Sequence, residues 1–418
     1  MNQVETVFLD LVRCGIKGET PTDPVLSAEG WDALLRLAES HRLLPLVLDL
    51  SLKLPSCSAA LSATGKDGAQ KPSGSAWKQN AFAQVSRQII QENEFLNLIL
   101  ALQAKGLDPV IMKGPACRAL YPNGWLRPSV DDDFTVPAEQ MAAFHTALLE
   151  YGMKPDEPEV DPEQAWEISY HAPNSTLYVE MHKCLFDPNS PVFSTFNTAF
   201  ADHFQHTSKL QVQDVAVQVM GPTDHLLFLI LHAFKHFLHS GFGVRIVADI
   251  CLFSQKYAEE IDFSRIFQFC QANSCFKFTA AVYRIGSLFL DLQIPEPFQA
   301  VEVDEAPLLA DMMNAGHLGV QMERLHSANI ILGAVSESRM GKRKSNFLKR
   351  AVFLPPDRLA GDFPFLKKHP WLVPVAWTRR VWTYLRTTKK YGKQSLTAPL
   401  RVGQERLELL KTYDIIQS

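Results

Sequence analysis

The chain has 418 residues, of which 46% are hydrophobic, so it is long enough for more than one domain and can bury sizeable cores. Its 41 Lys and Arg residues nearly balance its 45 Asp and Glu residues, which gives a formal net charge of -4. This balance excludes a chain-wide attraction to nucleic acid or to an anionic membrane, so any site for a polyanion must be local.

The cysteines and the first residues indicate the compartment. The seven cysteines are scattered and include no CxxC pair, which argues against a disulfide framework or a cysteine zinc site and favours a reducing environment. The stretch MNQVETVFLDLVRCG lacks the basic start and the continuous apolar core of a signal peptide. The most apolar later run, 225–238, is too short and too rich in His and Lys to span a bilayer. We therefore expect a cytoplasmic protein without a membrane partner.

The first quarter of the chain has helical patterns. Apolar residues recur at three- and four-residue steps over 5–54, which predicts two or three amphipathic helices. The segment PSCSAALSATGKDGAQKPSGS contains almost nothing to bury, so we expect a flexible loop at about 55–76. A helix should resume near Trp77 and stop at Gly106. These segments form a predicted N-terminal helical lobe, residues 1–105.

The hydrophobic period changes in the next part of the chain. Three runs have the length and composition of strands: 109–112, 130–136 and 176–183. The first ends at the turn Lys113-Gly114, and Pro115 then suits the first turn of a short helix. A helical pattern over 138–151 stops at Gly152. Strands with intervening helices predict a small α/β or α+β core, residues 106–190.

The remaining sequence is mostly helical in pattern, as in DHLLFLILHAFKHFLH and VRIVADICLFSQKY. We therefore predict a C-terminal helical domain over 191–418. Two basic clusters with interleaved aromatic residues lie near its end, at 342–350 and 379–393. Such clusters could bind a polyanion, although a charge run is more often a solvated face.

Three adjacent acids open the second predicted strand. Because side chains alternate across a strand, Asp131 and Asp133 share one polar face, whereas Asp132 shares the other, apolar face. An ionised side chain on an apolar face is costly unless it is hydrogen-bonded. We therefore expect Asp132 to have a structural partner, such as Arg127 or a backbone amide.

A second acidic strand faces the same way. The run at 176–183 places Glu180 and His182 on one polar side. Like-charged carboxylates a few ångströms apart repel unless a cation neutralises them, and Asp131, Asp133 and Glu180 offer the oxygen ligands that Mg²⁺ favours. Three carboxylates around two Mg²⁺ ions suit nucleotidyl or phosphoryl transfer. One ion lowers the pKa of the attacking hydroxyl, and the other steadies the leaving pyrophosphate.

Short motifs follow one another along the chain in a recognisable order. They are Ile111-Met112-Lys113-Gly114, Leu120-Tyr121-Pro122, Arg127-Pro128, the Asp-x-Asp of Asp131 and Asp133, Val179-Glu180-Met181-His182, the helix LLFLILHAFKH, Val244-Arg245-Ile246-Val247-Ala248-Asp249-Ile250 and the tail FPFLKKHPWLVPVAWTRR. In order and spacing they resemble the uncharacterised nucleotidyltransferase family of the DNA polymerase β-like superfamily. The similarity covers most of the chain.

The resemblance implies an α+β fold, with a small mixed-sheet nucleotidyltransferase core embedded in a mainly helical protein. It implies that Asp131 and Asp133 bind the metal ions and that Glu180 is the third carboxylate and candidate base. The turn of Lys113 and Gly114 stands where superfamily members usually show Gly-Ser or Gly-Gly, which binds the nucleotide phosphates. Lys113 therefore either contacts phosphate or packs beside the turn.

Two further candidate residues have open roles. Arg127 precedes the acidic strand, and it could clamp a triphosphate, act as counter-ion to the aspartates, or do both. His182 faces the same way as Glu180, and it could orient that carboxylate, contact the nucleotide or fill the edge of the core.

The leading hypothesis is an enzyme that transfers a nucleoside monophosphate from an NTP such as ATP to a hydroxyl-bearing acceptor. Two Mg²⁺ ions would be held by Asp131, Asp133 and Glu180. The acceptor stays open among a small molecule, a sugar, a protein and RNA. Two alternatives remain: a nucleotide-binding or interaction protein whose metal site has decayed, and an RNA-binding or RNA-modifying protein that uses the basic C-terminal face.

Overall fold

The computed structural model describes residues 1–62, 74–315, 322–339, 369–379 and 398–416, together with the single positions 359, 363, 366 and 382. The chain divides into two compact units. Unit 1 comprises Met1–Phe234 and Phe242–His317, and unit 2 comprises Lys235–Gly241 and Leu318–Ser418. The three-domain division drawn from the sequence stays a prediction.

Three helices open unit 1, as the amphipathic pattern predicted: α1 Gln3–Lys17, α2 Ala28–Ser40 and α3 Leu44–Ser51. Side-chain caps set where the first two begin. Asn2 forms a capping box with Glu5, and the Ser27 hydroxyl accepts the amide of Gly30. The buried faces of these helices pack against one another.

The segment expected as a flexible loop, 55–76, is helical at both ends. Helix α4 (Pro55–Ser62) covers its start, helix α5 (Gly74–Gln103) its end, and residues 63–73 lie outside the described residues. The loop prediction is therefore wrong for the two ends. Low hydrophobicity did not prevent a helix there, because the segment is rich in Ala and its first turn donates a backbone amide to Asp23.

Among the residues that the structure describes, no single helix is both long and apolar enough to cross a membrane. Only α3 and α4 taken together reach the required length and composition, and they are bent by 102° at the break between them.

A seven-stranded mixed sheet lies in unit 1, in the order β3-β4-β5-β2-β1-β7-β6. The strands are β1 Val110–Ile111, β2 Asp132–Thr135, β3 Lys154–Pro155, β4 Glu167–His171, β5 Tyr178–His182, β6 Thr207–Val212 and β7 Val215–Met220. Strand β2 runs parallel to β5, and β1 runs parallel to β7, while the other neighbours are antiparallel. The fold is therefore α+β with a helical majority, as predicted.

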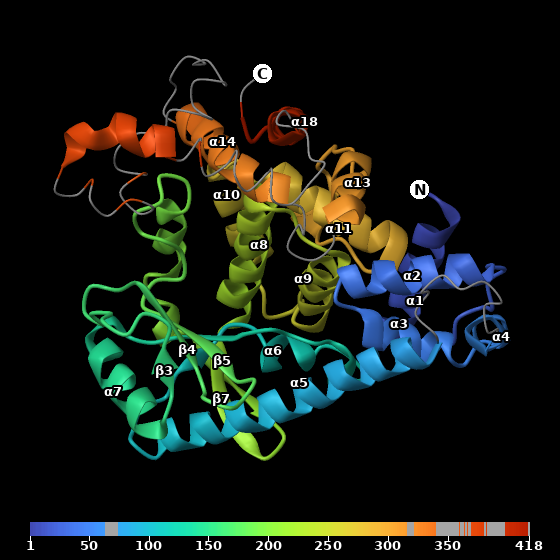
Figure 1. The fold of residues 1–418 in the computed structure, drawn as a ribbon, viewed down its shortest axis with the longest axis horizontal. Helices are drawn as coiled ribbons and strands as arrows, with labels where there is room; N and C mark the ends of the chain where they lie inside the picture. Colours follow the sequence, from blue (N-terminus) through green and yellow to red (C-terminus); the bar gives the residue numbers. More distant parts are fainter. Residues whose placement is uncertain are drawn as a thin grey trace. The chain divides into compact units, whose positions relative to one another are not determined.

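The central strands separate apolar from polar side chains, as alternation predicted. Phe134 of β2 lies beside Met181 of β5, and both belong to one buried apolar cluster. Side chains from α5 and from α7 (Met141–Tyr151) complete this cluster, and the long α5 continues from the sheet to α3 and α4 (Figure 1). Asp133 and Glu180 are register partners that lie outside it, on the polar face.

Strands β3, β4, β6 and β7 were not predicted. The hairpin of β6 and β7 joins the sheet next to β1, so the sheet extends beyond residue 190, where the sequence analysis ended the core. Its two-residue turn, Gln213-Asp214, lacks the Asn-Gly or Asp-Gly pair that marks such hairpins, although Gln213 has a φ of 50°. The missing turn residues explain why the sequence pattern did not reveal it.

The helices predicted after residue 222 are present. The described parts of the chain also contain α6 Pro115–Arg118, α8 Pro222–His239, α9 Val244–Lys256, α10 Phe263–Ala272, α11 Phe276–Leu290, α12 Glu296–Gln299, α13 Ala306–Ala315, α14 Met322–Arg339 and α18 Ala398–Thr412. The 3-10 helices are η1 Gly124–Leu126, η2 Ala138–Gln140, η3 Ser194–Phe200, η4 His203–Gln205 and η6 Pro370–Leu372. In unit 2, α14 packs against α18. The two predicted basic clusters lie outside the described residues, except for Arg379 and Trp382.

Candidate active site

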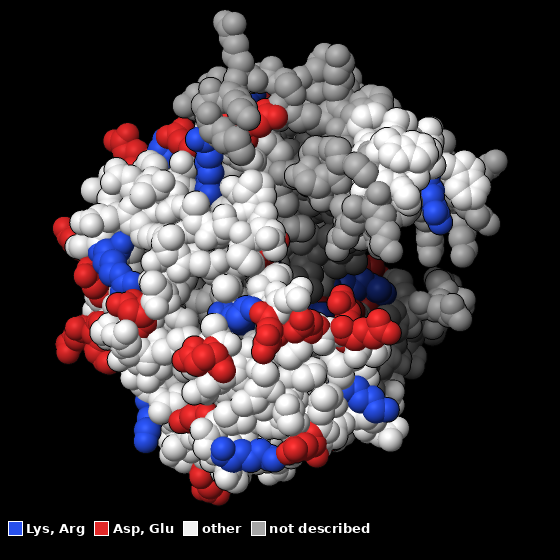
Figure 2. All heavy atoms as spheres, turned by 90° about the vertical axis from the view of Figure 1, so that its left-hand side faces the viewer, with Lys and Arg blue, Asp and Glu red and all other residues white. Residues whose placement is uncertain are grey.

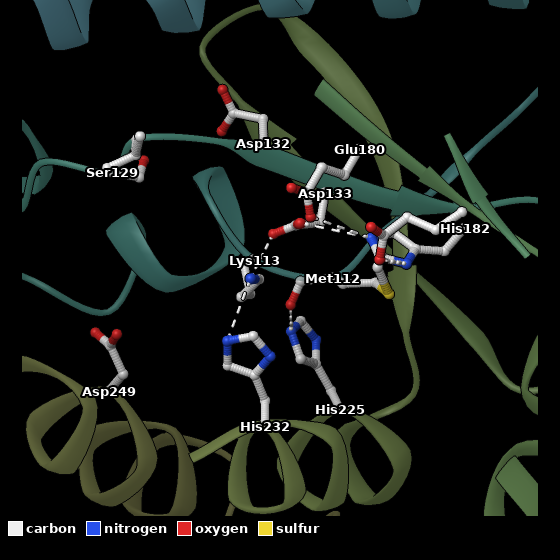
Figure 3. Close-up of polar contacts among 12 residues, drawn as sticks. Met112, Lys113, Ser129, Asp132, Asp133, Glu180, His182, His225, His232 and Asp249 are labelled. Carbon is white, nitrogen blue, oxygen red and sulfur yellow. Dashed lines mark hydrogen bonds and ion pairs between the residues drawn. The ribbon is translucent and has the colours of Figure 1, made fainter. Parts of the chain in front are cut away.

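Acidic side chains of two neighbouring parallel strands meet on the polar face of the sheet. Asp133 of β2 is the register partner of Glu180 of β5, and His182 follows two residues later on the same side. These three side chains point toward one another (Figure 3). One candidate ligand atom from each lies within 4.8 Å of the others, and no other such group occurs in the described parts of the chain. We call these three residues the acidic cluster.

His182 stands between the carboxylates of this cluster. Its Nε2 lies 3.6 Å from Asp133 Oδ1 and 3.7 Å from Glu180 Oε2, while its Nδ1 lies 3.4 Å from Glu167 Oε2. Burial lowers the pKa of His182, but the neighbouring carboxylates outweigh this effect and raise the pKa to about 9. These carboxylates therefore favour the protonated form of the imidazole.

Lys113 neutralises Asp133 from another side. Its Nζ lies 2.6 Å from Asp133 Oδ2 and 3.4 Å from Nε2 of His232, which belongs to α8 (Figure 3). Burial opposes ionisation of Asp133, but Lys113 and His182 hold the pKa of this carboxyl well below its usual range. Burial likewise opposes the charge on Lys113, and the carboxylates of Asp133 and Asp131 reverse this and raise its pKa. The aspartate is therefore a buried carboxylate matched by cations.

Asp131 lies immediately before β2 and is partly exposed. It is not a member of the acidic cluster, although its charge contributes to the raised pKa of Lys113. The structure thus brings together two of the three carboxylates proposed as metal ligands, Asp133 and Glu180, and places His182 with them. The role of Asp131 stays a prediction.

Asp132 points away from the acidic cluster (Figure 3). Its Oδ2 accepts a hydrogen bond of 2.9 Å from Gln91 Nε2, and its Oδ1 lies 3.5 Å from Arg118 Nη2. Burial raises the pKa of Asp132 to about 6, and the charge of Arg118 limits the rise. The expected structural partner exists, but naming Arg127 as that partner was wrong, because side chains of α5 and α6 reach this face of the strand first.

Arg127 forms a buried ion pair with Asp249 of α9. Its Nε and Nη2 donate to the two carboxylate oxygens of Asp249 at 3.0 and 2.5 Å, and the Tyr121 hydroxyl adds a bond of 2.8 Å to Oδ1. Arg245, also on α9, donates to the carbonyl of Pro128. These contacts tie the loop before β2 to α9. Among the described residues the ion-pair partner of Arg127 is Asp249, not one of the three strand aspartates, and its contact with a triphosphate stays a prediction.

The family of the chain follows from its sequence. A family model described as an uncharacterised nucleotidyltransferase matches residues 27–291. The chain belongs to this family. The match includes every strand of the sheet and all three residues of the acidic cluster. Comparisons with curated proteins and with solved structures found no match. Membership supports a transferase with a general role in nucleotidyl transfer and an NTP as substrate.

The donor set in this member of the nucleotidyltransferase family fits a divalent cation. Asp133 and Glu180 supply carboxylate oxygens, and His182 supplies a ring nitrogen that makes no hydrogen bond with any residue the structure describes. Carboxylate oxygens bind Mg²⁺ and Mn²⁺, and imidazole nitrogen binds transition metals. The cluster could therefore hold such an ion.

Sequence reasoning missed Glu167, which lies opposite His182 in the register of β4 and β5. A signal was present, because EISYH alternates polar and apolar residues as a half-buried strand does. The preceding stretch, KPDEPEVDPEQ, is so rich in Pro and acids that it favoured a loop. The strand was therefore overlooked together with its carboxylate.

The turn at Gly114 requires glycine, and a substitution there should be costly. Gly114 has φ 58° and ψ -113°, and a Cβ at this position would lie 2.1 Å from Asp132 Oδ1. We expect Gly114→Ala to lower the free energy of unfolding by about 2–3 kcal/mol, measured by urea denaturation. Gly106→Ala is the matched control, since Gly106 also has a positive φ of 74° but no atom within 4 Å of a built Cβ. Equal losses in the two variants would contradict the proposed close contact.

Proposed function

We propose that the protein transfers a nucleoside monophosphate from an NTP to a hydroxyl-bearing acceptor, with divalent cations at the acidic cluster. The observation that carries the proposal is the pairing of Asp133 with Glu180 on neighbouring parallel strands, in a chain that belongs to the nucleotidyltransferase family. Mg²⁺ or a similar ion bound there would neutralise the triphosphate and make the acceptor hydroxyl more acidic.

We assign different roles to Asp133 and Glu180 because their side chains differ in exposure. Asp133 is 1% exposed and is held by Lys113, so it is a rigid ligand. Glu180 is 26% exposed, which leaves it accessible to an acceptor, and we propose it as the base that takes the hydroxyl proton. Asp131 lies two residues before Asp133, immediately before β2, and is the proposed ligand of a second ion.

Lys113 and Gly114 are the proposed phosphate contacts. Lys113 places a partly buried ammonium group directly beside the proposed metal ligand Asp133, which is where the triphosphate and its cation would meet. A triphosphate would offer Lys113 a second set of negative oxygens without removing it from the cluster. Arg127 is not included, because Asp249 already balances its charge.

Labelled nucleotides test this proposal. The full chain is incubated with cell lysate and divalent cation, in parallel with α-labelled and γ-labelled NTP. Transfer of a nucleoside monophosphate retains the α label in an acceptor fraction and releases the γ label as pyrophosphate. Calorimetry should in addition show that NTP binding requires the cation and is lost with a chelator. Transfer of the γ label, or an absence of cation-dependent NTP binding, would exclude nucleotidyl transfer.

No comparable observation supports the two alternative functions, a decayed metal site and RNA binding. A decayed metal site does not fit a cluster in which both carboxylates and the imidazole still face one another. For RNA binding, on the face shown in Figure 2 the Lys and Arg side chains of the described residues are interspersed with Asp and Glu, and a row of acidic side chains crosses its middle. This face of the described residues therefore adds no support for RNA binding, and the basic clusters on which that alternative rests lie almost entirely outside the described residues. We further propose a cytoplasmic location, since all seven cysteines are free.

A further inference from the structure

The backbone and the ring of His182 are held firmly in place. Its carbonyl oxygen accepts hydrogen bonds from the Thr135 hydroxyl at 3.0 Å and from the amide of Val136 at 2.9 Å. Its side chain is only 7% exposed, and the ring of Trp166 lies 6.1 Å away. The position of the imidazole is therefore set by the pairing of β2 with β5 and does not depend on a flexible loop.

The ring nitrogens of His182 face carboxylate oxygens but lie too far from them for ordinary hydrogen bonds. The three separations, 3.4 to 3.7 Å, exceed the usual N–H···O length of about 2.7–3.2 Å. Neither nitrogen makes a hydrogen bond with a residue in the described ranges. Ligands of an octahedral ion with bonds of about 2.1–2.2 Å lie roughly 3–4.4 Å apart, which is how Nε2 is spaced from Asp133 and Glu180. The Nε2 side therefore has the spacing of a coordination site.

Glu167 occupies the other side of the ring. The register of β4 and β5 puts it opposite His182, and its Oε2 is the carboxylate oxygen at 3.4 Å from Nδ1. Histidines that bind metals commonly donate their second ring N–H to a carboxylate, which selects the tautomer and directs the free nitrogen at the ion. We propose that His182 binds the cation of the acidic cluster through Nε2, and that Glu167 is the residue that positions it.

This ligand set has a consequence for the choice of metal. Mg²⁺ strongly prefers oxygen ligands, whereas Mn²⁺ accepts both carboxylate and imidazole and binds mixed sets more tightly. Two carboxylates and one imidazole therefore select Mn²⁺ over Mg²⁺. The catalytic use of the ion rests on the proposed function, but its binding does not.

A different role for His182 predicts the opposite result. If the imidazole only serves as a built-in counter-ion to Asp133 and Glu180, a metal ion must compete with it. Removing the ring would then strengthen the binding of both Mn²⁺ and Mg²⁺. If His182 is a ligand, its removal weakens Mn²⁺ binding most.

The test uses the full chain with Mn²⁺ alone or Mg²⁺ alone and no nucleotide. We expect His182→Gln to weaken Mn²⁺ binding at least tenfold by calorimetry and Mg²⁺ binding by no more than about threefold. Pulsed electron paramagnetic resonance of bound Mn²⁺ should show coupling to a histidine ¹⁴N nucleus that His182→Gln abolishes. Retained Mg²⁺ binding shows that the variant is folded. Absence of ¹⁴N coupling in the wild type, or tighter binding of both ions by His182→Gln, would overturn the proposal.

Glu167→Gln tests the positioning role separately. It should weaken Mn²⁺ binding by about tenfold while the ¹⁴N coupling persists, because the ligand remains but its orientation is less constrained. His171→Gln is the matched control: this histidine of β4 pairs with Asp156 at 2.8 Å and is about half exposed, so neither readout should change. Unchanged Mn²⁺ affinity in Glu167→Gln would refute the role of Glu167. Mn²⁺ coordinated by nitrogen in a chain that binds no NTP would instead refute only the proposed function.

Discussion

Arg127→Met should lower the free energy of unfolding of unit 1 by about 3–5 kcal/mol, because it removes the cation that forms the ion pair with the buried carboxylate of Asp249. Arg127 and Asp249 are 4% and 5% exposed, so water cannot replace the lost partner. Tyr121 would remain, but one neutral hydroxyl does not balance a charge. The loss is measured by urea denaturation, and hydrogen exchange over residues 121–131 should show that the loop before β2 opens first.

Two further variants decide whether the loss comes from the stranded charge. Replacing Arg127, Asp249 and Tyr121 together, with Arg127→Met, Asp249→Leu and Tyr121→Phe, removes the stranded carboxylate and should recover part of the stability, although buried Arg245 then loses its interaction with Asp249. Lys53→Met breaks an exposed pair with Asp49, with side chains 59% and 47% exposed, and should cost about 0.5 kcal/mol or less. A triple variant no more stable than Arg127→Met would show that the pair is not the source of the stability.

The faces of the two acidic strands were predictable from local sequence. Alternation alone assigns Asp133 and Glu180 to one side and Phe134 and Met181 to the other, because the two-residue period of a strand does not depend on what packs against it. The structure confirms this division. The presence of helices over 5–54 and after residue 222 followed for the same reason, since the spacing of apolar residues is a local property.

The partners of the buried charges were not predictable in this way. Gln91 reaches Asp132 from 41 positions earlier in the chain, and Asp249 reaches Arg127 from 122 positions later. A single strand shows that a buried acid needs a partner, but the identity of that partner depends on which helix packs against the sheet. The register of β4, which brings Glu167 to His182, is likewise a tertiary property.

Asp133→Asn should reduce nucleotidyl transfer by about a thousandfold or more, and Asp132→Asn, the same change one residue earlier, should spare it within about tenfold. Loss of a metal ligand removes several kcal/mol of transition-state stabilisation, and about 4 kcal/mol corresponds to a thousandfold. Asn at position 132 can still accept the hydrogen bond of Gln91, on the side of β2 away from the acidic cluster. The readouts are kcat/KM for label transfer and, independently of the acceptor, Mn²⁺ affinity.

The Asp133→Asn variant also leaves the positive charge of Lys113 unbalanced. A second substitution that removes this charge provides the control. Asp133→Asn takes the closest partner from Lys113, whose partly buried ammonium group then weakens the fold and itself repels a cation. Asp133→Asn combined with Lys113→Met removes both charges, so this double variant should regain stability and yet remain inactive with weak Mn²⁺ binding. Recovered transfer in the double variant would mean that Asp133 serves only to hold Lys113. Equal losses of nucleotidyl transfer in Asp132→Asn and Asp133→Asn would mean that the two aspartates have the same role, although they lie on opposite faces of β2.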